Sequence, residues 1–425
     1  MQNYSLEGGV NMNDHIKWIE EKLLQINLVE SMNQAEGFSR LGYTKEEQAS
    51  QEQFRLISQS IGLKTYEDAA GNQWAMWEVD KQAGWIATGS HVDTVYSGGG
   101  YDGAAGVVAS LAAVKMLKDE SFQPRKNIAV IAFACEESAR FSVSTIGSKA
   151  ISGLLDEEKV ASYEDVNGVT LEKAFTKRGL DWHRIQDAQL EDDQLEQFIE
   201  LHIEQATKLE KSGKEIGIVQ SIAQPTRLHI TCTGKTNHTG TTPMNERQDA
   251  LVAIAPLITF IEEATIEINH EQAVALVATV STIQNTPNSM SMIPGEVVVG
   301  IDIRSTKADL KHRLVEKINH FVQQIEMNKP VSFTIKTLVD DEPTDLDPGI
   351  QETLTDICEK IGFSSMSLDS GAGHDVMNMS KRWPCGLIFI PCRDGISHHP
   401  LEHANMEDLL KGTKVIAEYL KETSC

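Results

Sequence analysis

The chain has 425 residues, of which 40% are hydrophobic and 24% are charged. This length exceeds what one compact core usually holds, so we expect two domains, or one domain with a large insertion. The formal net charge of −24 argues against nucleic acids and anionic membranes as partners, because phosphate binding needs clustered Lys and Arg. The six cysteines form no Cys-x-x-Cys pair and the N-terminus lacks a signal segment, which predicts a cytoplasmic protein with reduced cysteines.

The first part of the chain alternates between helical and strand-like periodicity. Its apolar pattern predicts two amphipathic helices, two strands, a buried helix and a continuous apolar strand of the kind found in parallel sheets. These elements are expected at residues 14–29, 45–60, 64–80, 84–90, 104–117 and 126–134. Arg40 lies between the two helices without an obvious partner, and we expect it to be solvated. Residues 152–195 are polar and helix-rich, and no chemistry is assigned to them.

The pattern of apolar residues changes near residue 217. The helix and strand pattern of the first part resumes near residue 340. Between them, strands and helices follow the order β-α-β-β-α-β, which is typical of a small antiparallel sheet with two helices on one face. The first five of these elements are expected at residues 228–233, 250–264, 273–282, 297–304 and 310–327. We predict an α/β domain with a mixed, mostly parallel sheet and helices on both faces, interrupted by an inserted ferredoxin-like α+β domain. The predicted limits are 1–216 and 339–425 for the first domain and 217–338 for the insertion.

The loop after the strand at 84–90 combines one imidazole, two carboxylates and several glycines. His91 and Asp93 are two residues apart, so on a strand they point the same way, and the carboxylate can hold the imidazole in one tautomer. Four glycines flank Asp102 and allow the backbone to approach a ligand closely. A glycine-rich turn with a capping aspartate is the alternative interpretation.

Two further strands end in polar side chains. Glu136 and Glu137 follow the strand at 126–134, where adjacent carboxylates are costly to bury unless positive charge lies between them. In residues 198–205, strand alternation places Glu200, His202 and Glu204 on one face. The alternatives are a solvated pair of glutamates and a histidine of the core.

The donors at the predicted strand ends form a set that suits metal ions. They are His91, Asp102, Glu137, His202 and His398, with Glu136 beside them. Three imidazoles and two carboxylates suit two divalent cations such as Zn²⁺, Mn²⁺, Co²⁺ or Ni²⁺. Two such cations would activate water and polarise a substrate carbonyl. Glu136 is then placed to take the proton from that water and return it to the leaving nitrogen.

Six motifs in order give the chain its resemblance to a known family. They are GSHVDTV at 89–95, GGYDG at 99–103, EESARF at 136–141, ELHIEQ at 200–205, HTGTTPM at 238–244 and GISH at 395–398. Together they resemble the M20 metallopeptidase superfamily, and within it the hydantoinase/carbamoylase amidases. That branch includes N-carbamoyl-L-amino acid hydrolases and allantoate amidohydrolases. The resemblance implies that the five donors bind two metals, that Asp102 bridges them and that Glu136 is the general base.

The resemblance also implies a substrate pocket and a homodimer formed through the inserted domain. His238 would reach the partner's active site to stabilise the oxyanion, and Arg304 would clamp the substrate carboxylate. Further expected substrate contacts are Gln205, Asn288, Ser291, Gly371 and Ala372. Ser291 is a departure, because the family usually has Asn there, and a hydroxyl lacks the paired donor and acceptor of an amide.

We predict a binuclear metal amidase that hydrolyses an N-carbamoyl-L-amino acid to the L-amino acid, carbon dioxide and ammonia. Allantoate is the alternative substrate, and an aminoacylase or dipeptidase activity comes third. A catalytically silent relative that binds amino-acid derivatives as a sensor is an alternative of another class, but Glu136 and all five ligands are present.

Overall fold

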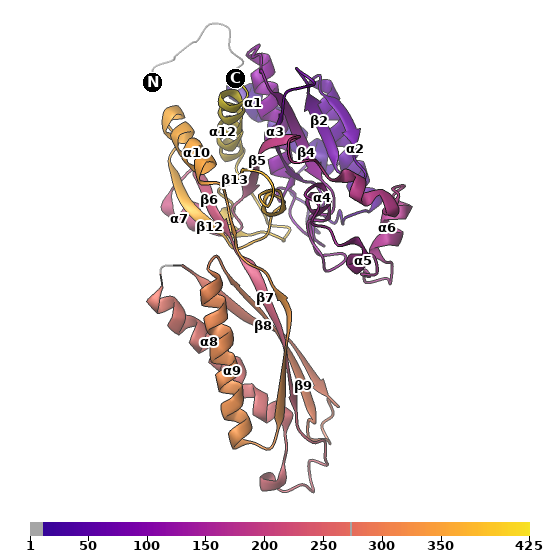
Figure 1. The fold of residues 1–425 in the computed structure, drawn as a ribbon, viewed down its shortest axis with the longest axis vertical. Helices are drawn as coiled ribbons and strands as arrows, with labels where there is room; N and C mark the ends of the chain where they lie inside the picture. Colours follow the sequence, from indigo (N-terminus) through magenta and orange to yellow (C-terminus); the bar gives the residue numbers. More distant parts are fainter. Residues whose placement is uncertain (1–11, 273) are drawn as a thin grey trace. The chain divides into compact units, whose positions relative to one another are not determined.

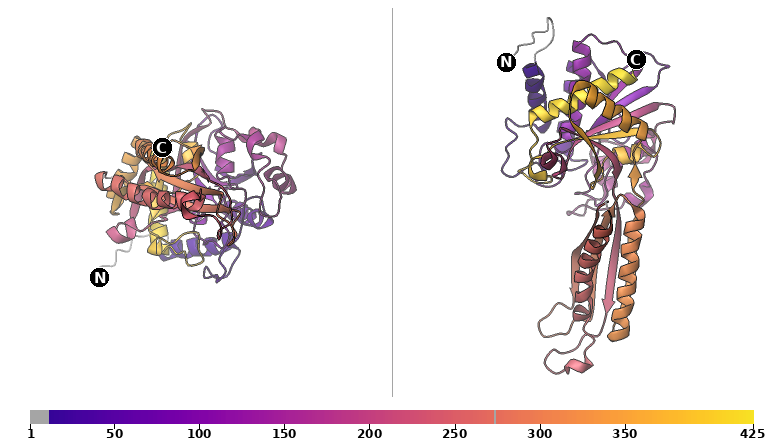
Figure 2. Two further views of the ribbon diagram at one scale, coloured as in Figure 1. Left: turned by 90° about the horizontal axis from the view of Figure 1, so that it is seen from below. Right: turned by 90° about the vertical axis from the view of Figure 1, so that its left-hand side faces the viewer.

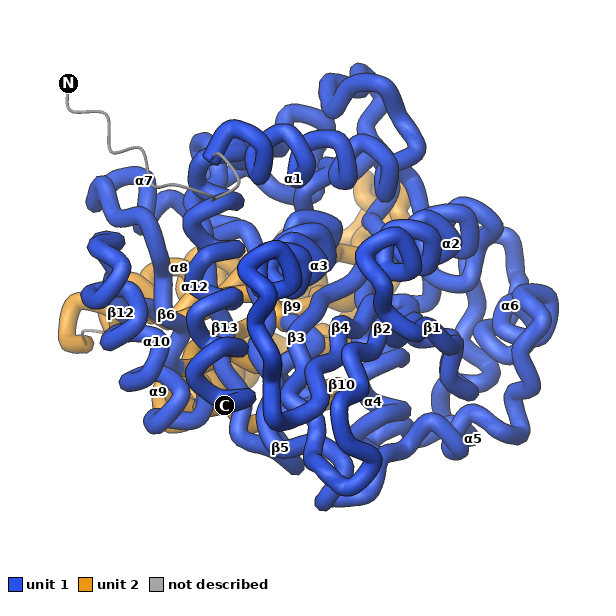
Figure 3. Tube along the Cα trace, turned by 90° about the horizontal axis from the view of Figure 1, so that it is seen from above, with its two compact units in different colours: residues 1–220, 346–368, 374–425 blue, residues 221–345, 369–373 orange. Residues whose placement is uncertain are grey.

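The structure is a computed structural model that describes residues 12–272 and 274–425, and it divides into two compact units (Figures 1 and 3). Unit 1 consists of Met1–Gln220, Leu346–Leu368 and His374–Cys425, of which residues 1–11 lie outside the described part. Unit 2 consists of Ser221–Asp345 and Asp369–Gly373. The boundaries expected from the sequence, after residues 216 and 338, differ from these by a few residues and have no equivalent of the segment 369–373.

Unit 1 is built on a mixed sheet in the order β1-β2-β4-β3-β5-β13-β6-β11, with β12 also paired to β6. The four central strands β4, β3, β5 and β13 are parallel, and antiparallel pairs flank them. The strands are β1 (Lys64–Glu67), β2 (Gln73–Trp77), β3 (Trp85–His91), β4 (Asn127–Phe133), β5 (Leu195–Ile203), β6 (Ile216–Ile222), β11 (Thr344–Asp345), β12 (Ser365–Ser370) and β13 (Cys385–Ile390).

Helices cover both faces of this sheet. In β5, Ile199, Leu201 and Ile203 join the main apolar core, which also contains α3 and α12. Glu200, between them, turns the other way and accepts a hydrogen bond from the backbone N–H of Val376 in α11. The helices of the unit are α1 (Met12–Asn27), α2 (Lys45–Ser60), α3 (Ala104–Asp119), α4 (Ile146–Ile151), α5 (Glu157–Val160), α6 (Leu171–Lys177), α7 (Lys208–Ser212), α10 (Pro348–Ile361), α11 (Val376–Met379) and α12 (Met406–Thr423). The predicted α/β class is confirmed.

Helix α3 lies unusually close to the sheet, and this closeness positions the site at its N-terminus. A Cβ on Gly106 would lie 2.0 Å from the carbonyl oxygen of Leu201, so only glycine lets the helix pack there. Thr88 in β3 and Ser110 in α3 also share a hydrogen bond of 2.9 Å. The residues just before α3 are therefore held against the end of β5.

Residues 152–195 form the expected short helices, which pack on residues from earlier in the chain to make a small second core. Phe141, Phe175 and Trp182 are central to this core, and the rings of Phe175 and Trp182 meet edge to face at 5.2 Å. Trp182–Ala188 forms a 3₁₀ helix here. Five of the six cysteines are buried, and all six are free thiols.

Unit 2 has a four-stranded antiparallel sheet in the order β10-β7-β9-β8, with α8 and α9 side by side on one face (Figures 1 and 2). Its elements are β7 (Gln224–Thr233), α8 (Ala250–Glu271), β8 (Leu276–Thr286), β9 (Glu296–Ser305), α9 (Ala308–Asn328) and β10 (Ser332–Asp340). This order is that of the predicted ferredoxin-like fold. The strand expected at 273–282 begins later and runs further, and residue 273 lies outside the described part.

Within residues 12–272 and 274–425, every helix is too short or too polar to cross a lipid bilayer.

Candidate metal centre

The predicted ligands lie at the carboxyl ends of four neighbouring parallel strands of unit 1 or in the loops that follow them. His91 ends β3, Glu137 follows β4, His202 lies at the end of β5 and His398 follows β13. Asp102 comes from the loop between β3 and α3. Because the carboxyl ends of parallel strands meet at one edge of a sheet, these five side chains converge there.

Two groups of possible metal ligands form at this edge, and they share Asp102. Its Oδ1 lies 3.4 Å from Nε2 of His91 and 3.0 Å from Nε2 of His202. Its Oδ2 lies 3.4 Å from Nε2 of His398, which is 3.3 Å from Oε1 of Glu137. Asp102 thus turns one oxygen toward each group, and it would contribute a ligand to both groups if each held a cation.

Backbone carbonyls orient two of the imidazoles. The Nδ1 atoms of His91 and His202 lie 3.0 Å and 2.9 Å from the carbonyl oxygens of Asp93 and Ile203. When Nδ1–H donates to a carbonyl, Nε2 is the nitrogen that is available to a metal ion. The carboxylate of Asp93 accepts the backbone N–H groups of Glu136 and Glu137, both at 3.0 Å, so Asp93 braces two loops of the site.

One glycine of the loop is required by the packing of a ligand. Gly103 has φ of 63°, in the left-handed region, and a Cβ there would lie 2.5 Å from the ring of His91. A side chain at this position, just before α3, would clash with His91. Glycine therefore allows His91 to pack closely beside Asp102.

Glu136 belongs to neither ligand group, although it is buried beside them. Its Oε2 lies 3.8 Å from Nε2 of His91. Cys135, with φ of 51°, turns the chain sharply after β4, a strained conformation for a side chain other than glycine. Burial raises the pKa of Glu136 well above its usual value, although His91 opposes the shift. Glu136 is thus a carboxylate that readily holds a proton next to the ligands.

Carboxyl groups outnumber basic side chains around the site. Nine carboxylates in the described part of unit 1 are buried, and they belong to Glu47, Asp93, Asp102, Glu136, Glu137, Glu200, Glu204, Asp375 and Glu402. Arg40 is the only buried Arg or Lys among the described residues of this unit. A buried carboxyl group is stable as an anion only beside positive charge, so further positive charge would be needed to ionise the whole cluster.

The pKa shifts of the three imidazoles and of Asp102 also indicate that positive charge is favourable at this site. Burial favours the neutral forms of His91 and His202, but the carboxylates outweigh burial and raise the pKa of both. Hydrogen bonds to Asp102 and Glu137 raise the pKa of His398 to about 11. Burial would raise the pKa of Asp102, but the imidazoles hold it well below its usual value. Cations at the Nε2 atoms would replace these protons, so the donor set fits divalent metal ions.

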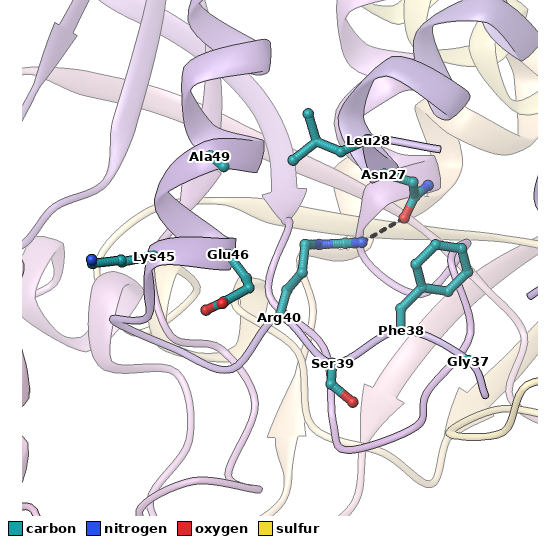
Figure 4. Close-up of a pocket in the computed structure, with 9 residues that line it drawn as sticks. All are labelled: Asn27, Leu28, Gly37, Phe38, Ser39, Arg40, Lys45, Glu46 and Ala49. Atoms are coloured by element: carbon teal, nitrogen blue, oxygen red, sulfur yellow. Dashed lines mark hydrogen bonds between the residues drawn. The ribbon is translucent and has the colours of Figure 1, made fainter. Parts of the chain in front are cut away.

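The expectation that Arg40 is solvated is wrong (Figure 4). Only 5% of the residue is exposed, and its side chain donates to the carbonyl of Val92 at 2.9 Å and to Oδ1 of Asn27 at 2.7 Å. Burial lowers the pKa of Arg40 to about 10, and Asp93 opposes the shift. Both partners are distant in sequence, so no local pattern could reveal this role. Arg40 supports the loop that carries the ligands.

Several buried acids near the ligands have supporting contacts that the sequence did not predict. Glu402 accepts backbone N–H groups beside Asp102. Glu200 accepts from Ser90 and Val376, and Asp375 accepts from Ser148. In the sequence, only one feature marks these acids: each lies close to a predicted ligand or to a glycine-rich loop.

The expected substrate contacts lie in both units. In unit 1, Nε2 of Gln205 lies 2.9 Å from Oδ2 of Asp102. In unit 2, Arg304 donates to Asp302 at 2.8 Å and to the carbonyl of Gly371 at 3.3 Å, with Ala372 next to Gly371.

A second group in unit 2 surrounds His238. Its loop pairs with the segment that contains Ser291, whose carbonyl accepts from the N–H of Thr239 at 3.2 Å. Asn288, with φ of 55°, lies in the same segment. His238 is exposed, and its Nδ1 accepts from the N–H of Gly240 at 3.0 Å. The structure thus separates His238 and Ser291 from Arg304.

The family of the chain follows from comparison with known proteins. The model of peptidase family M20/M25/M40 matches residues 75–422. The chain belongs to this family. It is 35% identical to the N-carbamoyl-L-amino-acid amidohydrolase of Paenarthrobacter aurescens over 386 residues. This alignment covers 91% of this chain and 93% of that protein. It is 32% identical to the allantoate amidohydrolase of Bacillus subtilis (strain 168), over 99% of each chain.

A solved structure extends the likeness to the fold. The hydantoinase/carbamoylase family amidase of Burkholderia multivorans superposes with a TM-score of 0.84 over 99% of each chain, at 26% identity. The predicted membership in the M20 superfamily and its hydantoinase/carbamoylase branch is confirmed. Dinuclear metal sites are typical of the M20 family, and the two donor groups that share Asp102 are placed to hold metal ions.

Proposed function

We propose that the chain hydrolyses the ureido C–N bond of N-carbamoyl-L-amino acids, with one water consumed and the L-amino acid, carbon dioxide and ammonia released. The chain is an amidohydrolase of the carbamoylase and allantoate amidohydrolase branch, and its bond class is therefore a non-peptide C–N bond. The observation that carries the proposal is the pair of ligand groups sharing Asp102, with Glu136 buried beside them but outside both.

The residues of the site divide the reaction between them. His91, His202, His398, Asp102 and Glu137 would hold two divalent ions. Such ions supply Lewis-acid polarisation of the carbonyl and make bound water a nucleophile near neutral pH. Glu136 takes a proton from the attacking water and returns it to the leaving nitrogen. This role suits a buried carboxylate whose pKa is raised, because it then accepts a proton more readily than an exposed carboxylate.

Arg304 is proposed to bind the substrate carboxylate. Asp302 holds its Nε at 2.8 Å and the carbonyl of Gly371 lies 3.3 Å from Nη1, so the guanidinium is fixed in direction. A planar guanidinium recognises a carboxylate with two parallel hydrogen bonds.

The geometry of unit 2 supports a homodimer in which His238 acts on the partner's substrate. Strands β7 and β9 pair from Thr233 opposite Glu296 to Pro225 opposite Arg304, and the chain leaves Thr233 toward His238. Eight residues of β9 separate these ends, which is about 26 Å at roughly 3.3 Å per residue. An N-carbamoyl amino acid is too short to contact both Arg304 and His238 of one chain. A second subunit would supply the missing donor.

Allantoate is the second candidate substrate, because the chain is 32% identical to the allantoate amidohydrolase of Bacillus subtilis over 99% of each chain. We expect manganese-loaded enzyme to release an L-amino acid from N-carbamoyl-L-amino acids, measured by chromatography together with ammonia. The D-enantiomers and chelator-treated enzyme are the controls. Turnover of allantoate alone would select the second candidate. Turnover of N-acyl amino acids or dipeptides alone would reject both.

Replacing Arg304 by Ala should lower kcat/KM for N-carbamoyl-L-amino acids by about 10- to 100-fold, the effect of losing one or two charge-assisted hydrogen bonds. Arg227→Ala is the matched control, because Arg227 donates to the other oxygen of Asp302 at 2.9 Å. A carbamoylated amine without a carboxylate should be turned over equally slowly by wild type and by Arg304→Ala. Equal kcat/KM of the variant and wild type for the carboxylate substrate would refute the clamp.

A further inference from the structure

Glu402 connects two loops that each carry a proposed metal ligand. Its Oε1 accepts the backbone N–H groups of Tyr101 and Asp102, both at 2.9 Å. Its Oε2 lies 3.0 Å from Oγ of Ser397, the residue before His398. Ser397 Oγ is also 2.8 Å from Oδ2 of Asp102. One carboxylate thus contacts the backbone of the bridging ligand and the loop of a second ligand, about 300 residues apart in sequence.

The burial of Glu402 shows that this contact is built into the fold. Only 5% of the residue is exposed, so its oxygens depend on these protein donors rather than on solvent. The carboxylate packs directly on Gly99, where a Cβ would lie 2.1 Å from Oε1 of Glu402. The φ of Gly99 is not in the left-handed region, so space for Glu402, rather than backbone conformation, excludes a side chain there.

We propose that Glu402 is a positioning residue that locks the loop of Asp102 to the loop of His398 and thereby sets the spacing of the two metal ions. The inference rests on the proposed dinuclear site. Glu402 acts through its hydrogen bonds, since it is in neither ligand group. Partners beyond the direct ligands typically change metal affinity by about 10- to 100-fold when they are lost.

The test is a titration of Mn²⁺ into metal-free protein, followed by calorimetry, with the Mn–Mn coupling read by electron paramagnetic resonance. Wild type should bind two ions per subunit with a coupled signal. Glu402→Ala should bind at least one ion about 10- to 100-fold more weakly and lose the coupling. Glu402→Gln should stay within about 3-fold of wild type, because its amide oxygen still accepts both N–H groups and its NH₂ can donate to Ser397.

Two other variants separate positioning from general stability. Gly99→Ala keeps the carboxylate but displaces it, and it should reproduce the loss seen in Glu402→Ala. Asp249→Ala is the matched control, because Oδ1 of Asp249 also accepts two backbone N–H groups, both at 3.1 Å, at the start of α8 in unit 2, which carries none of the proposed ligands. Its Mn²⁺ affinity should not change.

Each outcome separates the inference from the proposed site. If wild type binds no pair of ions, the dinuclear site itself is rejected. If wild type binds two ions and Glu402→Ala binds them equally well, the positioning role is rejected. A Glu402→Gln variant as weak as Glu402→Ala would also reject it, since charge rather than hydrogen-bond geometry would then matter. If Glu402→Ala does not fold, Gly99→Ala and Glu402→Gln still decide.

Discussion

Glu136→Gln is expected to lower kcat by about 10²- to 10⁴-fold, the usual contribution of a general acid–base group. The amide cannot accept the proton of the attacking water. Metal content should stay at the wild-type level, because Glu136 belongs to neither ligand group. The measurement is steady-state release of amino acid beside metal analysis of the same preparation.

The neighbouring carboxylate provides the contrast. Glu137→Gln should lose metal as well as activity, since Oε1 of Glu137 lies 3.3 Å from Nε2 of His398 within a ligand group. The two variants differ by one position in sequence and make the same chemical change. If Glu136→Gln lost metal or kept full activity, its assignment as the base would be wrong.

His238→Ala is expected to lower kcat by about 10²- to 10³-fold, as loss of an oxyanion donor does. His238 is exposed, so the substitution should leave the stability of the chain nearly unchanged. Mixing His238→Ala with Glu136→Gln subunits tests which chain it serves. In a random mixture, half of the dimers are hybrids, and one site in each hybrid combines an intact Glu136 with the partner's intact histidine.

The mixture should therefore recover about one quarter of wild-type activity if His238 acts across the interface. If His238 acts within its own chain, every site in the mixture lacks one of the two groups, and no activity returns. The control is each variant mixed with itself under the same exchange conditions. Analytical ultracentrifugation of the same samples reports whether dimers form.

The candidate site could be predicted because its residues stand at positions that the local sequence pattern marks as strand ends. His91, Glu137 and His202 stand where apolar strands end, and in a parallel sheet those ends converge. The β-α-β-β-α-β order predicted the architecture of unit 2 for a similar reason, since periodicity and connection order leave few topologies. The roles of His238 and Arg304 stay predictions.

The supporting interactions could not be anticipated, because they join residues that only the tertiary fold brings together. The sequence around Arg40 predicts a surface residue, yet Arg40 is buried and donates hydrogen bonds to Val92 and Asn27. Glu402 has no local pattern to mark it, and its contact with Asp102 depends on how the last part of the chain returns to the first. The bounds of β8 were also misjudged, because exposed strands lack clear apolar alternation.

The position of β13 has a consequence for how the protein is made. This strand lies between β5 and β6 in the sheet, but it belongs to the last part of the chain. During synthesis, β5 and β6 would leave the ribosome well before the strand that fills the gap between them, so their edges stay unpaired until then. His398 emerges later still. Assembly of the sheet and completion of the ligand set are thus both deferred until β13 and the loop after it have emerged, and chains truncated before β13 should be prone to aggregate.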